Sequence, residues 1–209
     1  MSYRKYKAVH ILGLYRADVQ TDNIDSREQL QGDVWSLTDW YRSYPWLTQL
    51  DRHYELHGAV ATEKSVGKPG RDQDRFPGDW KQKYRDHGGK IVVWDMEWLD
   101  VLGLPKERFE TIDAGYLTKK YGREAMSSTV SIMILDAIEH KYERIWLHGL
   151  CMIGSRHEYF IPGVLEAMDA ARREGIKITA NFEHEWRAKC TGELSKIGSY
   201  IDICKRKAS

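Results

Sequence analysis

Helix and strand patterns alternate along residues 127–180, and few fold classes accommodate that alternation. The segment from Ser127 to Ile138 begins with hydroxyl residues suited to capping a helix, and its apolar side chains cover nearly every helix face. A helix with that pattern is expected to be buried against a sheet. Three further elements continue the alternation: a strand at 143–149, an amphipathic helix at 157–174 and a strand at 176–180.

The first half of the chain carries more short apolar strands, and these are expected at 7–13, 33–37, 52–57 and 90–94. A helix is predicted at 79–87, a partly helical aromatic stretch at 40–46, and loops with Gly103 and Pro105 after the fourth strand. Short apolar strands separated by helices favour parallel pairing with right-handed crossovers. The sequence therefore predicts a Rossmann-like α/β fold, with residues 1–204 forming one domain.

Composition limits the classes of partner. The chain has 209 residues, of which 42% are apolar, and 32 Lys and Arg against 31 Asp and Glu give a net charge of +1. No global field favours nucleic acid or an anionic membrane. The three cysteines are widely spaced and suit reduced thiols, and no apolar run approaches 18 residues. We expect a soluble protein in the cytoplasm, or in the host cytoplasm if a phage encodes it.

Residues 58–79 are rich in Gly, Pro and charged side chains, and we expect them to form a lid-like insertion. Its basic residues could contact DNA, although a solvated loop is the simpler interpretation: Lys64, Lys68, Arg71 and Arg75. The basic tail, residues 205–209, is expected to be disordered. The sequence does not indicate an oligomeric state.

In open parallel sheets, ligands bind outside the carboxyl ends of the strands. Six residues are predicted to contact a nucleotide there: Gly13, Thr38, Asp39, Ser127, Ser128 and Gly149. The serines begin a helix, where backbone N–H groups and the helix dipole attract phosphate. Each residue also has a purely structural explanation, such as an ordinary helix cap for the serines or a tight turn for the glycines.

Two histidines are candidates for a general base. Glu55 and His57 alternate along one predicted strand, so the carboxylate could orient the imidazole. His157 and Tyr159 follow the loop after Gly149, where a base or a substrate contact would be well placed. The structural alternatives are a satisfied core histidine for His57 and a solvated helix start for His157.

No metal site is predicted, because the segment around Glu183, His184 and Cys190 lacks a second His or Cys at ligand spacing. The phosphate-binding P-loop, the serine-hydrolase elbow and the dinucleotide-binding glycine motif are all missing from the sequence. These absences weigh against a P-loop kinase, an α/β-hydrolase and a standard NAD-dependent dehydrogenase.

Two blocks of sequence resemble a known group of enzymes. Ser127-Ser128-Thr129-Val130 through Ile138, followed by Tyr142-Glu143-Arg144-Ile145-Trp146-Leu147-His148-Gly149, is similar to a block in bacterial Rossmann-like sialyltransferases and in 6-hydroxymethylpterin pyrophosphokinase-like proteins. Uncharacterised phage proteins share this block. Thr38-Asp39 and Tyr54-Glu55-Leu56-His57 resemble the upstream motifs of the same group, so the likeness covers about 34–60 and 115–180.

In the sialyltransferases this block binds the nucleotide of a nucleotide-sugar donor, which implies phosphate and ribose contacts for Ser127, Ser128 and Gly149. Two positions depart from the family pattern. Gly13-Leu14-Tyr15 stands where a Gly-Ser or Gly-Pro-Ser turn is usual, and Cys151 stands where an Asp is usual. Because both departures touch the nucleotide site, a changed donor or the loss of catalysis stays open.

The leading hypothesis is a metal-independent glycosyltransferase that takes a nucleotide-sugar donor and a DNA or glycan acceptor, with His57 or His157 as the base. The pyrophosphokinase-like resemblance implies an alternative, the transfer of diphosphate from ATP. That reaction needs magnesium, for which Asp39, Asp95 and Glu97 are the available ligands. A third hypothesis is a non-catalytic module that sequesters a nucleotide.

Overall fold

The computed structural model describes residues 7–13, 24–38, 40–59, 79–150, 152, 157–181 and 183–193. The strands are β1 (Ala8–Leu12), β2 (Asp33–Leu37), β3 (Arg52–Glu55), β4 (Lys90–Val93), β5 (Phe109–Thr111), β6 (Arg144–His148) and β7 (Lys177–Ala180). The helices are α1 (Trp40–Ser43), α3 (Trp80–Asp86), α4 (Trp98–Leu102), α5 (Ala114–Tyr121), α6 (Thr129–Glu139), α7 (Ile161–Arg173) and α8 (Glu183–Glu193). Short 3-10 turns are η2 (Arg27–Gln29), η3 (Lys106–Arg108), η4 (Glu124–Met126) and η5 (Glu158–Phe160).

The described strands form one parallel sheet of seven strands in the order β5-β4-β3-β2-β1-β6-β7. β1 lies at the turning point of this order, with Ile11 opposite Trp35 of β2 and opposite Leu147 of β6. The chain builds outward from β1 to β5 and then returns to the other side of β1 with β6 and β7. The gap between the carboxyl ends of β1 and β6 is therefore the topological switch point of the sheet.

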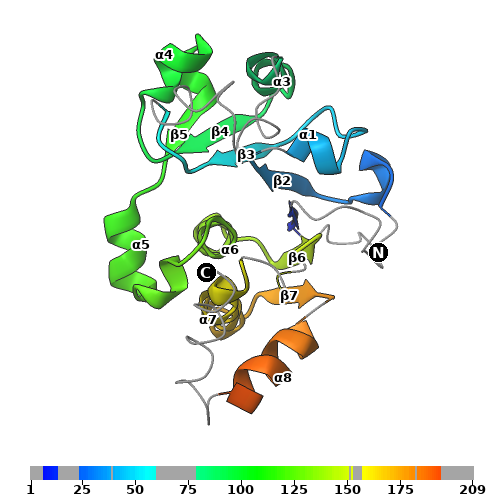
Figure 1. Cartoon of the computed structure of the whole chain (residues 1–209), viewed down its shortest axis with the longest axis vertical. Helices are drawn as coiled ribbons and strands as arrows, with labels where there is room; N and C mark the ends of the chain where they lie inside the picture. The colour runs from blue at the N-terminus through cyan, green and yellow to red at the C-terminus, as the bar shows by residue number, and fades with distance from the viewer. Residues whose placement is uncertain are drawn as a thin grey trace, which may run out of the picture.

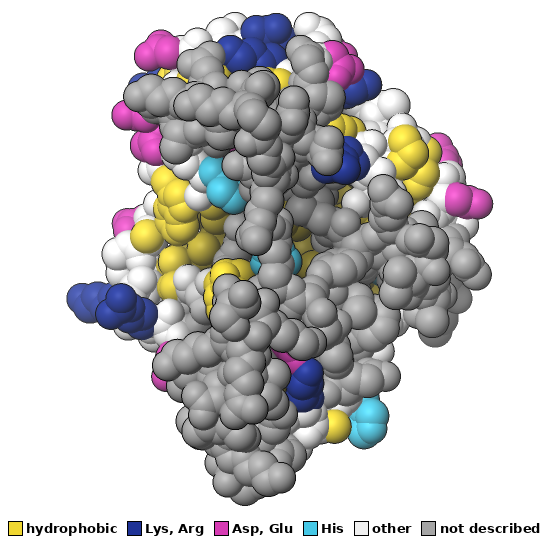
Figure 2. All heavy atoms as spheres, in the orientation of Figure 1, with side chains coloured by type: hydrophobic (Ala, Val, Ile, Leu, Met, Phe, Trp, Pro, Cys, Tyr) yellow, Lys and Arg dark blue, Asp and Glu magenta, His cyan; other side chains and the backbone are white. Residues whose placement is uncertain are grey.

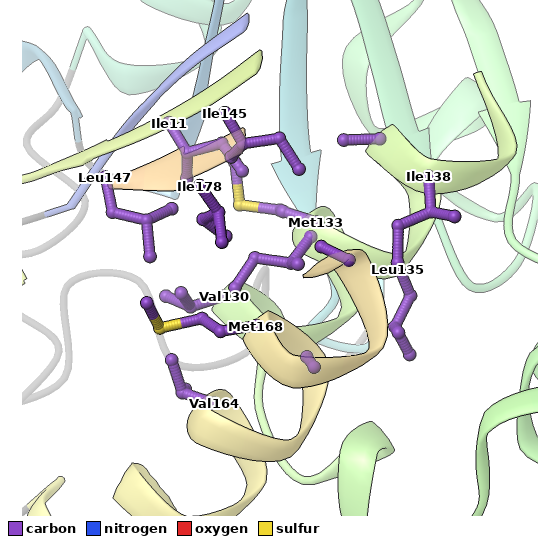
Figure 3. Close-up of a cluster of buried hydrophobic side chains, with 14 of the residues drawn as sticks. Ile11, Val130, Met133, Leu135, Ile138, Ile145, Leu147, Val164, Met168 and Ile178 are labelled. Carbon is purple, nitrogen blue, oxygen red and sulfur yellow. The ribbon is translucent and has the colours of Figure 1, made fainter. Parts of the chain in front are cut away.

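Helices cover the sheet from two sides (Figure 1): α5, α6 and α7 lie on one face, and α1, α3 and α4 lie on the other. The alternation of side chains along each strand decides which face each residue supplies. Val9 and Ile11 join the core under α6 and α7, whereas Leu12 joins the core under α1 and α3. Figure 3 shows Met133 of α6 close to Ile145 of β6 within the first core. This doubly wound arrangement confirms the predicted α/β class.

The predicted helix at 127–138 is α6. Eight of its residues between Val130 and Ile138 are buried, a larger share than in any other described helix. Apolar side chains surround it because it packs against the sheet and against α7. The helix expected at 157–174 is also present, although its first turn is the 3-10 turn η5 before α7 begins at Ile161.

Four elements were not expected from the sequence. The stretch after β4, which contains Gly103 and Pro105, includes α4 and the three-residue edge strand β5. A strand of that length carries too little alternation to be recognised. α5 and α8 were also missed, because each presents many polar residues and only a weak apolar face: α5 has one buried residue, Leu117, and Trp186 is buried in α8.

A charged cluster joins the amino ends of the strands to the end of α6. The Arg52 guanidinium lies 3.2 Å from the Asp136 carboxylate and 2.6 Å from that of Glu110. The Tyr54 hydroxyl donates to Asp136 at 2.5 Å, and the same arginine contacts the His140 ring. Arg52 and Asp136 are each only 13% exposed, so this cluster fixes α6 on the sheet at the edge opposite the switch point.

Some predictions fall where the structure gives no description. Residues 60–78 of the predicted insertion and the whole of the tail, 205–209, lie outside the described residues. Within the described part of the chain, no helix has both the length and the hydrophobicity needed to cross a membrane.

Candidate functional site

The order of the strands brings several predicted site residues to one edge. Glu55 ends β3, Thr38 follows β2, Gly13 follows β1 and Gly149 follows β6, and these four strands are consecutive in the sheet. Neighbouring strands lie about 4.8 Å apart, so the edge from β3 to β6 spans about 14 Å. This length is comparable with that of an extended nucleotide ligand.

The glycines at the switch point allow two chain segments to leave the sheet side by side. The N–H of Gly13 donates to the carbonyl oxygen of His148 at 2.8 Å. A Cβ at position 13 would lie 2.4 Å from the carbonyl oxygen of Gly149, which no side chain can accommodate. Gly149 itself has φ 62°, in the left-handed region that favours glycine. Close packing of the backbone accounts for both glycines, and their predicted contacts with a ligand stay a prediction.

Glu55 and His57 form a hydrogen-bonded pair, as the sequence predicted, but the strand does not extend as far as expected. β3 ends at Glu55, and His57 lies beyond it in a turn. The His57 Nδ1 lies 2.5 Å from Glu55 Oε1, and the His57 N–H also donates to that oxygen at 3.3 Å. The carboxylate is fully buried while the imidazole is 45% exposed. The buried carboxylate orients the imidazole through Nδ1, an arrangement typical of a histidine that acts as a general base.

Two aromatic residues hold this pair in place. The Tyr84 hydroxyl of α3 donates to Glu55 Oε2 at 2.6 Å, so both carboxylate oxygens of Glu55 are hydrogen-bonded. The Trp98 Nε1 of α4 donates to the carbonyl oxygen of His57 at 2.9 Å. The rings of Tyr84 and Trp98 are themselves stacked, with centroids 6.2 Å apart. The pair therefore rests on two helices whose sequences showed no polar motif. Figure 2 shows histidine side chains (cyan) reaching the surface of one face.

Two buried histidines lie beneath the pair. His53 packs against Trp40, Tyr84 and His87, with ring centroids 4.7, 4.5 and 5.6 Å away. Within the described residues, both ring nitrogens of His53 and the Nε2 of His87 lack a hydrogen-bond partner. Burial lowers the pKa of His53 well below its usual value and that of His87 to about 4. Both rings are therefore neutral in the folded protein.

Acid is expected to unfold the protein through these rings. The unfolded histidines take up protons below about pH 6.5 while the folded ones do not, so stability is lost as pH falls from about 6.5 toward 4. Each ring contributes at most about 1.4 kcal/mol per pH unit. Replacing His53 by Phe removes one such ring, and urea unfolding at pH 7.5, 6 and 5 should show a shallower decline for H53F. Equal declines for both proteins would show that burial does not lower the pKa of His53.

The predicted phosphate-binding serines are part of a helix cap. Ser128 is the N-cap of α6: its Oγ accepts from the Ser131 N–H at 3.1 Å, and Ser131 Oγ accepts from the Ser128 N–H at 3.0 Å. Ser127 packs against α7, where a Cβ at position 163 would lie 1.8 Å from its Oγ. The structural alternative thus explains Ser128, whereas Ser127 is exposed and its predicted phosphate contact stays a prediction.

Ser128→Ala should lower the free energy of unfolding by about 1 kcal/mol, because the Ser131 N–H loses its acceptor. Ser128→Asp keeps an acceptor at this position and is the matched control, expected to stay within about 0.5 kcal/mol of the wild type. Chemical denaturation measures both. Equal stability of Ser128→Ala and the wild type would argue against the cap.

Three further predicted site residues lie in the described part of the chain. Thr38 is buried with φ 30°, and its N–H donates to the Tyr54 carbonyl at 3.1 Å. His157 directly precedes η5 and its ring stacks on Phe160, while Tyr159 is 56% exposed. Asp39 and Cys151 lie outside the described residues.

The candidate metal ligands do not converge in the described part of the chain, where no group of three or more His, Cys, Asp or Glu side chains is placed to hold a metal ion. Asp95 accepts a hydrogen bond from the N–H of Glu97 at 3.0 Å, as in a turn. Glu183 instead forms an ion pair with Arg172, which attaches α8 to α7, and a second one with Arg187 of its own helix.

Sequence reasoning missed two residues at the switch point. His10 of β1 and His148 of β6 have ring nitrogens 3.0 Å apart. A single histidine in an apolar strand carries no signal by itself, and only the register of β1 against β6 brings the two together. An open depression of about 410 Å³ lies instead at the opposite edge of the sheet, and its lining is Arg27, Glu28, Thr48, Gln49, Leu50 and Asp51.

Comparison with known proteins supports the fold. No model of a known protein family matches the chain, and no curated protein matches it in sequence. Among solved structures, the chain is similar to the sialyltransferase CstII from Campylobacter jejuni, determined in complex with a substrate analogue, cytidine-5'-monophosphate. The TM-score is 0.50 at 13% identity, over 82% of this chain and 78% of that one. The similarity is one of fold.

Proposed function

We propose that the protein is a glycosyltransferase that uses a nucleotide-sugar donor, without a metal ion, and that His57 is its general base. The observation that carries this proposal is the Glu55–His57 pair, which lies at the carboxyl edge of a sheet similar to that of a sialyltransferase solved with a cytidine nucleotide. The sugar, the acceptor and the independence from metal are part of the proposal. A glycan or DNA would serve as the acceptor.

The reaction follows from the geometry of the pair. His57 Nε2 takes the proton of an acceptor hydroxyl, and the hydroxyl oxygen then forms a bond to the anomeric carbon of the sugar. The bond from that carbon to the phosphate oxygen breaks, and the nucleoside phosphate leaves with the electron pair. Glu55 stabilises the imidazolium that forms, because its buried carboxylate accepts from Nδ1. The N-terminus of α6 with Ser127 is the proposed seat for the departing phosphate.

A thermal-shift screen against nucleoside phosphates and nucleotide sugars, each with EDTA or with magnesium, tests the proposal. At a ligand concentration of 100 Kd the protein gains about 2.7 kcal/mol, which corresponds to about 5–10 °C for a chain of this size. We expect this shift with cytidine-5'-monophosphate and its sugar donors, and we expect EDTA to leave it unchanged. A shift only with ATP and magnesium would instead indicate diphosphate transfer. Binding with no turnover of any donor would indicate a sequestering module.

A further inference from the structure

The described helices leave one face of β6 and β7 open. The core on the side of α1, α3 and α4 contains residues of β1, β2, β4 and β5, but none of β6 or β7. The opposite face of these two strands is covered, because Ile145, Leu147 and Ile178 belong to the core under α6 and α7. Parallel sheets are normally covered on both faces, so the open face is expected to have a binding partner.

A tryptophan stands at the centre of this open face. Trp146 is the middle residue of β6, and β6 is an inner strand that pairs with β1 on one side and with β7 on the other. Side chains on an inner strand of a parallel sheet normally lie under a helix. Trp146 is nevertheless 36% exposed, so a large aromatic ring is offered to a partner at this position.

The two sides of the Trp146 ring have different neighbours. On the β1 side the His10 ring stacks on the indole, with centroids 6.2 Å apart and planes 7° apart. On the β7 side the residue opposite Trp146 in the register is Thr179, which is exposed and too short to cover an indole. A flat ring placed over Thr179 would therefore continue the stack that runs from His10 through Trp146.

The other side chains that β6 and β7 place on this face are basic or neutral. Arg144 lies opposite Lys177 in the register, two residues before Trp146 on the same face, or about 6.6 Å along the strand. Lys177 is exposed, and Arg144 is partly exposed. Within β6 and β7, no Asp or Glu side chain lies on this face. The open face therefore suits a ligand that combines flat rings with negative charge.

We infer that this face binds single-stranded nucleic acid, with a base stacked on Trp146 and backbone phosphates near Lys177 and Arg144. Aromatic side chains among basic residues bind single strands because every base offers a flat ring and every nucleotide a phosphate. In a duplex the bases are stacked on one another and could not reach the indole. A mononucleotide would be covered on one side only, whereas tight small-molecule sites enclose most of their ligand. The inference goes beyond the proposed function and holds whether or not the protein transfers a sugar.

Fluorescence anisotropy with a labelled oligothymidylate of about 15 nucleotides tests the inference. Trp146→Ala should weaken binding by about 10–100-fold, which is the expected loss of one stacked base. Trp94→Ala is the matched control: Trp94 is also 36% exposed but follows β4, and its replacement should leave the affinity unchanged. Lys177→Glu should also weaken binding, and this exposed change on an edge strand serves if Trp146→Ala does not fold.

Two further ligands separate stacking from attraction by charge alone. An abasic strand of the same length and a duplex should each bind at least about tenfold more weakly than the oligothymidylate. Equal binding of the abasic strand, unchanged affinity of the folded Trp146→Ala or Lys177→Glu variant, or no binding by the wild type would overturn the inference. A dimer that light scattering shows to dissociate in Trp146→Ala would also overturn it, because the face would then join two copies of the chain.

Discussion

Replacing His57 by glutamine should lower kcat of donor-to-acceptor transfer by about 10²–10⁴-fold, with little change in KM for the donor. Glutamine can still donate to Glu55 but cannot accept a proton, so binding survives while proton transfer does not. Steady-state kinetics with a nucleotide-sugar donor measure both constants. Lys83→Gln, an exposed change on α3 beside Tyr84, is the matched control and should leave kcat unchanged.

Glu55→Gln separates positioning from proton transfer. The variant keeps a hydrogen-bonding side chain next to His57 and Tyr84 but removes the negative charge that stabilises the imidazolium. The variant should therefore lower kcat of transfer and leave KM for the donor nearly unchanged. Full activity of the His57 variant would contradict the assigned base, and in that case His157 would be the next candidate.

The second large effect is on stability. Asp136→Ala should lower the free energy of unfolding by about 3–5 kcal/mol, because it leaves the Arg52 guanidinium and the Tyr54 hydroxyl without their shared acceptor in a largely buried cluster. Urea unfolding at pH 7 measures this loss. Asp136→Asn keeps one acceptor oxygen and should lose less. Since the cluster lies at the amino edge, nucleotide affinity should stay unchanged in any variant that folds. A loss below about 1 kcal/mol would show that Glu110 alone satisfies the arginine.

The sequence predicted the elements whose patterns are set by burial alone. α6 is apolar on nearly every side, and Gly149 and Gly175 mark the ends of their elements by needing positive φ. These signals are local, so one segment is enough to recognise them. The edge strand β5 and the helix α5 were missed because a short edge element buries few side chains.

The candidate site could be predicted only in part, for a different reason. Glu55 and His57 are two residues apart, so their contact follows from local spacing even though the strand ends earlier than expected. Tyr84 lies 29 positions from Glu55, and His148 lies 138 positions from His10. Such contacts depend on the order and register of the strands, which no single segment encodes. Ser128 is the opposite case. Its local sequence pattern correctly predicts a helix cap, but a helix cap does not by itself indicate that a ligand binds.

The central claim is that a nucleotide binds at the carboxyl edge of β1 and β6. Hydrogen exchange with and without cytidine-5'-monophosphate, followed by peptide mass spectrometry, tests this most directly. We expect slower exchange in the peptides that contain Gly13 and Gly149 and no change around Arg27 and Asp51 at the opposite edge. Protection confined to Arg27 and Asp51, or no protection at a saturating concentration, would contradict the account.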